Sequence, residues 1–298
     1  MPVKQNLKSV AKRALDVAFN AKVSGLRLVG AVDFKVPPNH NLRTTSSTTI
    51  RHYYESGLTT MLPIIVAAMD QGFDFSKSQN VLDFGCGVGR QLLHLSKWYP
   101  KISLSACDVD SDVIRYVKEA YPQVSAYVNA FDPPLGYRNE SFDMVYSVSI
   151  FSHMSLGDRG LWLAELLRIV KPGGLALITF NGLHSLRMSH ARGLRQQFTE
   201  EKFACEGYIF DSNDNQNRIK ERIENPRFGQ SARGITRPYG ETYYHPARVD
   251  EYFGSTGFVV VRLLEGIIDR LQDLVVLKKP VHRDTHAGSR ASQHASRG

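Results

Sequence analysis

The segment that decides the fold is Val81-Leu-Asp-Phe-Gly-Cys-Gly-Val-Gly-Arg90. It begins as a buried-strand run that ends in an acidic residue, and it opens into a turn with glycine at three alternating positions. Glycine permits a positive φ and lets a ligand approach the backbone closely. A helix is predicted to follow, from about Val88 to Lys97, and the N–H groups at its start can bind a ligand carboxylate or phosphate. The segment therefore predicts a strand–turn–helix unit that binds a nucleotide-like ligand.

The spacing of the glycines narrows the choice of ligand. Gly85 and Gly87 fit the dinucleotide-binding pattern G-x-G-x-x-G, but Arg90 stands where its third glycine belongs. A long arginine there argues against a pyrophosphate lying over the start of the helix. Asp83, inside the segment, would repel a phosphate and attract an amino group. The pattern therefore disfavours a nicotinamide dinucleotide.

The next acidic residue supplies a second constraint. Asp108 ends the strand predicted over 102–108 and follows Asp83 by 25 residues, close to the spacing of a β-α-β unit. A carboxylate there can accept the protons of both ribose hydroxyls. A ligand with an amino acid at one end and an adenosine ribose at the other is S-adenosylmethionine. Two alternatives stay open: the glycines form an ordinary βα turn, or Asp108 caps the helix predicted from Ser111.

The ordered set of motifs resembles the class I S-adenosylmethionine-dependent methyltransferases, in the form of bacterial small-molecule enzymes. The resemblance covers about residues 78–181. It implies an α/β fold with a Rossmann-like, doubly wound, seven-stranded sheet in three layers, mostly parallel with an antiparallel edge strand. The segments that carry it are Asp83–Arg90, Cys107–Asp110, Ser141–Ser147 and Leu167–Gly174.

Cofactor-binding residues follow from the glycine turn and from this resemblance. Phe131 and Asp132 stand where the family contacts the adenine, although Asp132 could instead form the turn before Pro133-Pro134. The full predicted set is Asp83, Gly85, Cys86, Gly87, Gly89, Arg90, Asp108, Val109, Ala130, Phe131, Asp132 and Ser147.

The candidate general base follows the strand predicted over 142–148. His153 stands at its carboxyl end, where the family often has a histidine, and imidazole serves as a base at neutral pH. The alternative is that it packs under the cofactor or caps the loop. Tyr239 and His245 are second choices, in an aromatic segment that forms either the acceptor pocket or an ordinary packed lid. Glu165 and Arg168 are expected to face solvent.

Composition and charge limit the class of protein. The 298 residues are 42% hydrophobic, with no apolar run long enough to span a bilayer. The net charge of +8 is concentrated in residues 1–30 (+5) and 281–298 (+2), so the domain itself is nearly neutral and no nucleic-acid partner is expected.

The three cysteines suggest neither a disulfide framework nor a zinc site, and no metal ligands are predicted. The N-terminus shows no signal pattern. A cytoplasmic protein is expected.

Three parts are predicted along the chain: an N-terminal helical extension (1–75), a methyltransferase domain (76–280) and a disordered tail (281–298). Alternating strands and helices predict a parallel sheet, and a cap insertion over 182–247 follows the fifth strand. Strands are predicted at 79–84, 102–108, 124–128, 142–148, 174–180 and from 258 and 274; helices are predicted at 4–21, 50–57, 59–71, 111–120, 157–170 and 249–253.

The predicted function is methyl transfer from S-adenosylmethionine to a small-molecule acceptor, a sugar-containing compound or natural product, by in-line displacement. One alternative is a nicotinamide-dependent oxidoreductase, against which Asp83 and Arg90 argue. The other is a non-catalytic S-adenosylmethionine-binding or membrane-associated scaffold. It would use the basic stripe of the helix over 4–21, whose alanine-rich apolar face disfavours membrane insertion. The acceptor and the oligomeric state stay open.

Overall fold

The computed structural model describes residues 35–37, 49–211 and 240–281. The helix predicted over 4–21, Tyr239 and the tail from residue 282 lie outside the described residues. Within these ranges, no helix combines the length and the apolar character that a membrane crossing needs.

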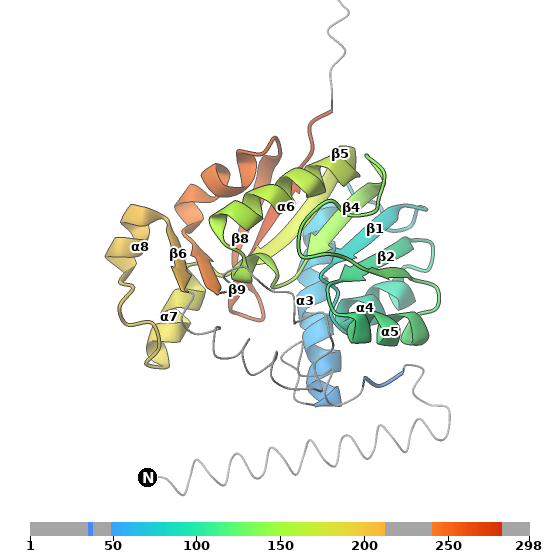
Figure 1. The fold of residues 1–298 in the computed structure, drawn as a ribbon, viewed down its shortest axis with the longest axis horizontal. Helices are drawn as coiled ribbons and strands as arrows, with labels where there is room; N and C mark the ends of the chain where they lie inside the picture. The colour runs from blue at the N-terminus through green and yellow to red at the C-terminus, as the bar shows by residue number, and fades with distance from the viewer. Residues whose placement is uncertain (1–34, 38–48, 212–239, 282–298) are drawn as a thin grey trace, which may run out of the picture.

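A seven-stranded sheet forms the centre of the molecule, with strand order β3-β2-β1-β4-β5-β9-β8 (Figure 1). The first five strands run parallel, and β9 runs antiparallel to both of its neighbours, β5 and the edge strand β8. This topology confirms the predicted fold class. The strands are β1 (Asn80–Phe84), β2 (Ser103–Asp108), β3 (Ser125–Val128), β4 (Phe142–Ser147), β5 (Val170–Phe180), β8 (Val259–Ile268) and β9 (Gln272–Lys278).

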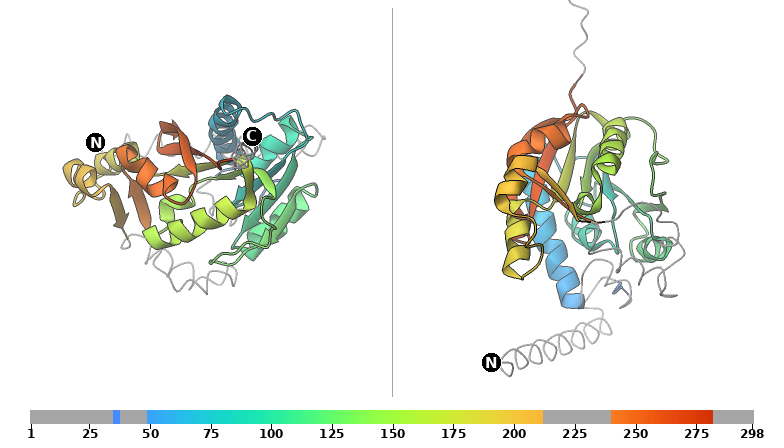
Figure 2. Two further views of the ribbon diagram at one scale, coloured as in Figure 1. Left: turned by 90° about the horizontal axis from the view of Figure 1, so that it is seen from above. Right: turned by 60° about the vertical axis from the view of Figure 1, so that its left-hand side comes forward.

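Helices cover both faces of the sheet and complete three layers (Figures 1 and 2). Buried apolar residues of α3, α4 and α5 share one core with the sheet, and those of α6 and η5 share a second core on the opposite face. The helices are α3 (Ile50–Asp70), α4 (Arg90–Trp98), α5 (Ser111–Ala120), η2 (Phe151–His153), α6 (Leu156–Ile169), η4 (Pro246–Arg248) and η5 (Asp250–Gly254).

The strand order reverses beside β1, which pairs with β2 on one side and β4 on the other. In open α/β sheets, ligands bind at the carboxyl ends of the strands at such a switch point. The glycine turn follows β1 directly, so the topology places it at this position.

One helix prediction was wrong. Two helices were expected at 50–57 and 59–71, but α3 runs unbroken from Ile50 to Asp70 with Pro63 inside it. Gly57 does not end a helix: a Cβ there would lie only 2.4 Å from the Arg90 carbonyl oxygen. The glycine therefore allows α3 to pass close to the start of α4.

The insertion forms a small cap beside the sheet (Figure 1). Its two strands pair with each other as a two-stranded antiparallel sheet. β7 is joined to the end of β5, because the Asn181 carbonyl accepts the N–H of Tyr244 at 2.9 Å. The described cap elements are α7 (Leu183–Ala191), α8 (Glu200–Glu206), β6 (Tyr208–Asp211) and β7 (Glu241–Tyr244).

Candidate active site

The glycine turn adopts a conformation that suits glycine at all three positions. Gly85, Gly87 and Gly89 have φ values of 77°, 51° and 70°. A Cβ at Gly85 would also lie 2.3 Å from the Ile150 side chain. The N–H groups of Gly85 and Cys86 both donate to the Cys107 carbonyl at the end of β2, at 2.9 and 3.0 Å. The turn is therefore held across the ends of β1 and β2.

Asp108 connects β2 to this turn. Its Oδ2 accepts the N–H of Gly87 at 2.9 Å, and its Oδ1 accepts the N–H of Asp110 at 3.0 Å. The cap of α5 is Asp110, whose side chain accepts from Asp112 and Val113, so Asp108 does not cap the helix. Burial raises the pKa of Asp108. Its carboxylate therefore lies against the glycine turn, and its contact with a cofactor stays a prediction.

Asp83 and Arg90 lie behind the turn. Asp83 is 1% exposed, and its Oδ2 accepts the Tyr146 hydroxyl at 2.9 Å. Burial raises the pKa of Asp83 to about 7. Arg90 donates from Nη1 to Ser56 Oγ of α3 at 3.2 Å, and burial lowers the pKa of its guanidinium, an effect that the nearby Asp269 and Asp83 oppose. On either end of the turn, Asp83 thus contacts β4 and Arg90 contacts α3.

The start of α4 offers backbone donors at the same place. Gly89 is its N-cap and makes no side-chain capping hydrogen bond. The first N–H groups of a helix lack partners within it and suit a ligand carboxylate. An acidic strand end and a helix start without a side-chain cap therefore lie on either side of the glycine turn.

The remaining predicted cofactor residues occupy different environments. Ser147 is fully buried, and its Oγ donates to the Phe84 carbonyl at 3.0 Å, which ties β4 to β1. Cys86 is buried, and burial raises the pKa of its thiol. The segment after β3 starts beside Asp108, because Asn129 N–H donates to the Asp108 carbonyl at 3.0 Å. Ala130, Phe131 and Asp132 follow this contact, and Val109 follows Asp108 directly.

The expectation that Glu165 and Arg168 face solvent is wrong. Glu165 is 6% exposed and accepts the N–H of Leu135 at 2.7 Å. Arg168 binds Glu165 and the carbonyls of Leu135 and Tyr137. Both side chains lie against the β3–β4 connection, which packs on this side of α6.

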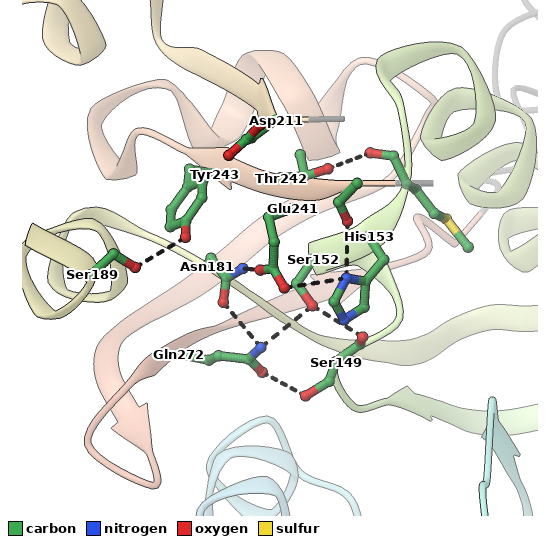
Figure 3. Close-up of polar contacts among 12 residues, drawn as sticks. Ser149, Ser152, His153, Asn181, Ser189, Asp211, Glu241, Thr242, Tyr243 and Gln272 are labelled. Atoms are coloured by element: carbon green, nitrogen blue, oxygen red, sulfur yellow. Dashed lines mark hydrogen bonds and ion pairs between the residues drawn. The ribbon is translucent and has the colours of Figure 1, made fainter. Parts of the chain in front are cut away.

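His153 lies between the domain and the cap (Figure 3). Its Nδ1 is 3.0 Å from the Gly240 carbonyl oxygen and 3.8 Å from Glu241 Oε1. A carbonyl only accepts, so Nδ1 carries the proton in the neutral imidazole and Nε2 is the proton-accepting nitrogen. The cap strand β7 therefore orients the candidate base.

A chain of polar side chains continues from Glu241 into the sheet (Figure 3). Asn181 donates to Glu241 Oε2 at 3.1 Å and accepts from Gln272 Nε2 at 3.1 Å. Gln272 Oε1 accepts from Ser149 Oγ at 3.0 Å and Thr179 Oγ1 at 2.9 Å. This network joins the carboxyl ends of β4 and β5 to the start of β9.

Ser149 carries backbone strain within this network. Its φ is 61°, which is unusual for a residue with a side chain. Such strain is concentrated at functional sites, where neighbouring contacts hold it. Here Ser149 N–H donates to Thr179 Oγ1 at 2.7 Å. A hydrogen bond from the backbone of Ser149 to β5 thus holds this conformation at the end of β4.

The structure does not bring His245 to this network. Its Nδ1 accepts the N–H of Ala247 at 3.3 Å, and its ring packs on Phe203 with centroids 5.1 Å apart. His245 directly follows the last residue of β7, whereas Glu241 is the first residue of that strand. The sequence analysis did not predict Ser149, Asn181, Glu241 and Gln272 as site residues. Only Glu241 could have been found from the sequence, because it lies in the aromatic segment between Tyr239 and His245.

Comparisons with known proteins agree with this geometry. A family model described as a methyltransferase domain matches residues 81–174. The chain is 35% identical over 99 residues to the 2-methyl-6-phytyl-1,4-hydroquinone methyltransferase of Synechocystis, covering 33% of this chain and 30% of the relative. It is 31% identical over 97 residues to the malonyl-[acyl-carrier protein] O-methyltransferase of Hahella chejuensis, covering 32% of this chain and 34% of the relative. The chain thus spans about a third of the length of these relatives.

Solved structures share the fold. A SAM-dependent methyltransferase from Methanosarcina mazei superposes with a TM-score of 0.51 at 16% identity, over 74% of this chain and 98% of that one. A protein from Pyrococcus horikoshii OT3 superposes with a TM-score of 0.50 at 18% identity, over 76% of this chain and 91% of that one.

The chain has the fold of solved S-adenosylmethionine-dependent methyltransferases. Residues 81–174 of this chain are its matched methyltransferase domain, and S-adenosylmethionine is the cofactor of this domain class.

Proposed function

We propose that this protein is an S-adenosylmethionine-dependent methyltransferase that acts on a small-molecule acceptor. The observation that carries the proposal is the position of Asp108. Its carboxylate stands at the end of β2 and accepts the N–H of Gly87 at 2.9 Å, two residues before Gly89, the N-cap of α4. A carboxylate on one side and backbone donors on the other match a ligand with a ribose and an amino-acid carboxylate.

The residues present fit this cofactor. Asp108 would hold the ribose hydroxyls, the first N–H groups of α4 would hold the methionine carboxylate, and Ala130 to Asp132 would line the adenine. Gly85 and Gly89 cannot carry a side chain without meeting Ile150 or Tyr121. When bound, S-adenosylmethionine supplies a methyl group on a sulfonium that is open to in-line displacement.

His153 is proposed to accept the proton of the acceptor. Its Nδ1 donates to the Gly240 carbonyl, which fixes the ring and presents Nε2 as the base. Glu241, 3.8 Å from Nδ1, would stabilise the imidazolium that forms. Proton removal of this kind suits an acceptor with an ionisable hydroxyl.

The class of acceptor is inferred from the cap and from the relatives. The cap contributes Glu241 to a polar network with Asn181 and Gln272, and such groups suit a polar acceptor such as a sugar-containing compound or natural product. The relatives named above act on a hydroquinone and on a malonyl group of an acyl-carrier protein. The three free cysteines support a reducing cytoplasm as its location.

Equilibrium binding of labelled S-adenosylmethionine and of nicotinamide dinucleotides to the full chain tests the proposal. We expect binding of S-adenosylmethionine alone, with a large loss of affinity in Asp108→Ala. Asp70→Ala is the matched control, because Asp70 pairs with Arg262 on the surface. Binding of a nicotinamide dinucleotide instead, or equal affinity in Asp108→Ala and wild type, would contradict the proposal. Mass spectrometry of acceptor pools incubated with labelled cofactor would then identify the acceptor.

A further inference from the structure

The connection between β3 and β4 begins next to Asp108. It spans residues 129–141, and the structure gives it neither helix nor strand. It begins at Asn129, whose N–H donates to the Asp108 carbonyl at 3.0 Å. Residues 130–132 follow at once, with Phe131 half-buried and Asp132 exposed. We call residues 129–141 the adenosine-side loop. A segment without regular structure depends on other elements to hold its shape.

Two side chains of α6 hold this loop by its backbone. Glu165 Oε1 accepts the N–H of Leu135 at 2.7 Å, and Arg168 Nη2 donates to the carbonyl of the same residue at 3.2 Å. Arg168 Nη1 also donates to the Tyr137 carbonyl at 2.9 Å and to Asn139 Oδ1 at 2.8 Å. Both backbone groups of Leu135 are thus satisfied by α6.

The two side chains also hold each other. Arg168 Nε donates to Glu165 Oε2 at 2.8 Å, and Nη2 donates to Oε1 at 2.6 Å. The Glu165 side chain is only 5% exposed and that of Arg168 is 30% exposed. A buried carboxylate is costly unless a cation and further donors satisfy it, and here Arg168 and the Leu135 N–H do so. The Glu165–Arg168 pair is therefore largely buried and holds the loop, unlike an ion pair on the surface. We call this pair the clamp.

Apolar contacts fix the same part of the loop. Leu135 is 3% exposed. The ring of Tyr137 packs edge-on against Phe142 of β4 and Tyr127 of β3, with centroids 4.7 and 5.1 Å away. The loop is thus anchored at 135–139, and residues 130–132 are the part of it that is proposed to line the adenine.

The same helix is joined to the candidate base. His153 ends η2, and Ser155 caps α6 by accepting the N–H of Asp158 at 3.2 Å. From Leu156 to Arg168, α6 extends about 18 Å at the rise of an α-helix. One helix therefore extends from the segment of His153 to the side chains that hold the adenosine-side loop.

We propose that Glu165 and Arg168 are positioning residues that clamp the adenosine-side loop for cofactor binding, and this rests on the proposed function. They do not touch the cofactor themselves. The clamp keeps residues 130–132 beside Asp108, so that the loop is ordered before the cofactor binds. Loss of the clamp would make binding bear the cost of ordering the loop.

The test compares wild type with Arg168→Gln, Arg168→Lys and Glu165→Gln. Two quantities are measured on the full chain: hydrogen exchange of peptides from 129–141, and affinity for S-adenosylhomocysteine by calorimetry. We expect faster exchange confined to the loop in Arg168→Gln, with affinity about tenfold weaker, the size of one charge-assisted hydrogen bond. KM for S-adenosylmethionine should rise with little change in kcat, and Arg168→Lys should recover part of the loss.

Arg262→Gln is the matched control, because it removes an exposed arginine paired with Asp70 far from the loop along the sheet order. Unchanged loop exchange in Arg168→Gln would overturn the clamp, and faster exchange with unchanged affinity would overturn its role in binding. Glu165→Gln keeps the shape of the side chain and provides a second folded variant, verified by circular dichroism. Wild type that failed to bind S-adenosylhomocysteine would instead contradict the proposed function, and with it the cofactor role of the clamp.

Discussion

His153 and Glu241 meet where the cap contacts the domain, with Nδ1 of the imidazole 3.8 Å from Oε1 of the carboxylate. The neighbouring Gly240 carbonyl lies 3.0 Å from the same nitrogen. The cap therefore supplies both groups that orient the candidate base. A site assembled in this way depends on β7 as well as on the end of β4.

The first prediction concerns this pair. His153→Gln should lower kcat by about 10²- to 10⁴-fold, the usual contribution of a general base, and leave S-adenosylhomocysteine affinity unchanged. Glu241→Gln should lower kcat by about tenfold, since a charge-assisted contact contributes roughly 1.5–3 kcal/mol. Steady-state kinetics with the identified acceptor measures both. Glu206→Gln, on the exposed surface of the cap, is the control. A normal kcat in His153→Gln would remove this residue from the mechanism.

The second prediction concerns the glycine turn. Gly85→Ala should destabilise the fold by about 1–3 kcal/mol, because a positive φ of 77° is strained for alanine and the methyl group would strike Ile150. Cofactor binding should fall with it. Gly160→Ala is the contrasting variant: no other atom of the described residues lies within 4 Å of a Cβ added at Gly160, which lies inside α6. It should stabilise the protein by up to about 1 kcal/mol. Urea unfolding of both variants measures these changes.

The turn, Asp108 and the fold class could be predicted because their signals are local. Glycine spacing, an acidic strand end and alternating strands and helices all lie within short segments. Gln272 and Asn181 lacked such a signal, since they meet only when β9 lies beside β5. Glu241 belongs to a segment that was singled out for its aromatic residues, but pairing with His153 depends on how the cap docks.

Tertiary contact also explains the errors in the prediction. Gly57 looked like a helix end, but its lack of a side chain serves the approach to Arg90. Glu165 and Arg168 looked like a solvent-facing helical pair at i and i+3. The β3–β4 loop covers them instead, and nothing in the charge pattern of α6 indicates that covering.

The third prediction concerns stability and pH. Burial raises the pKa of Asp83 and of Asp273 to about 7. Between pH 4 and pH 7 the unfolded chain ionises these groups while the folded protein keeps them protonated, so folding stability falls as pH rises. Each group contributes a slope of up to about 1.4 kcal/mol per pH unit. Urea unfolding across this range should show that Asp273→Asn reduces the slope. An identical slope in wild type and variant would contradict the assignment.

The fourth prediction compares two arginines of α6. Arg159 lies over the rings of Tyr252 and Tyr244, at 5.2 and 5.8 Å. Among the described residues, its buried Nε and Nη1 have no hydrogen-bond partner. Buried donors without partners cost about 1–3 kcal/mol each, which offsets the attraction of the cation to the rings. Arg159→Met keeps most of the packing and removes the donors, so it should leave stability unchanged or raise it by about 1 kcal/mol.

Arg168→Met should have the opposite effect, although the same atoms are replaced on the same helix. It would leave the Glu165 carboxylate buried without its cation, and breaking a buried pair in this way costs about 3–5 kcal/mol. Thermal and urea unfolding of the two variants measures the difference. A loss of stability in Arg159→Met as large as that in Arg168→Met would show that the rings of Tyr252 and Tyr244 hold Arg159 as firmly as a carboxylate holds Arg168.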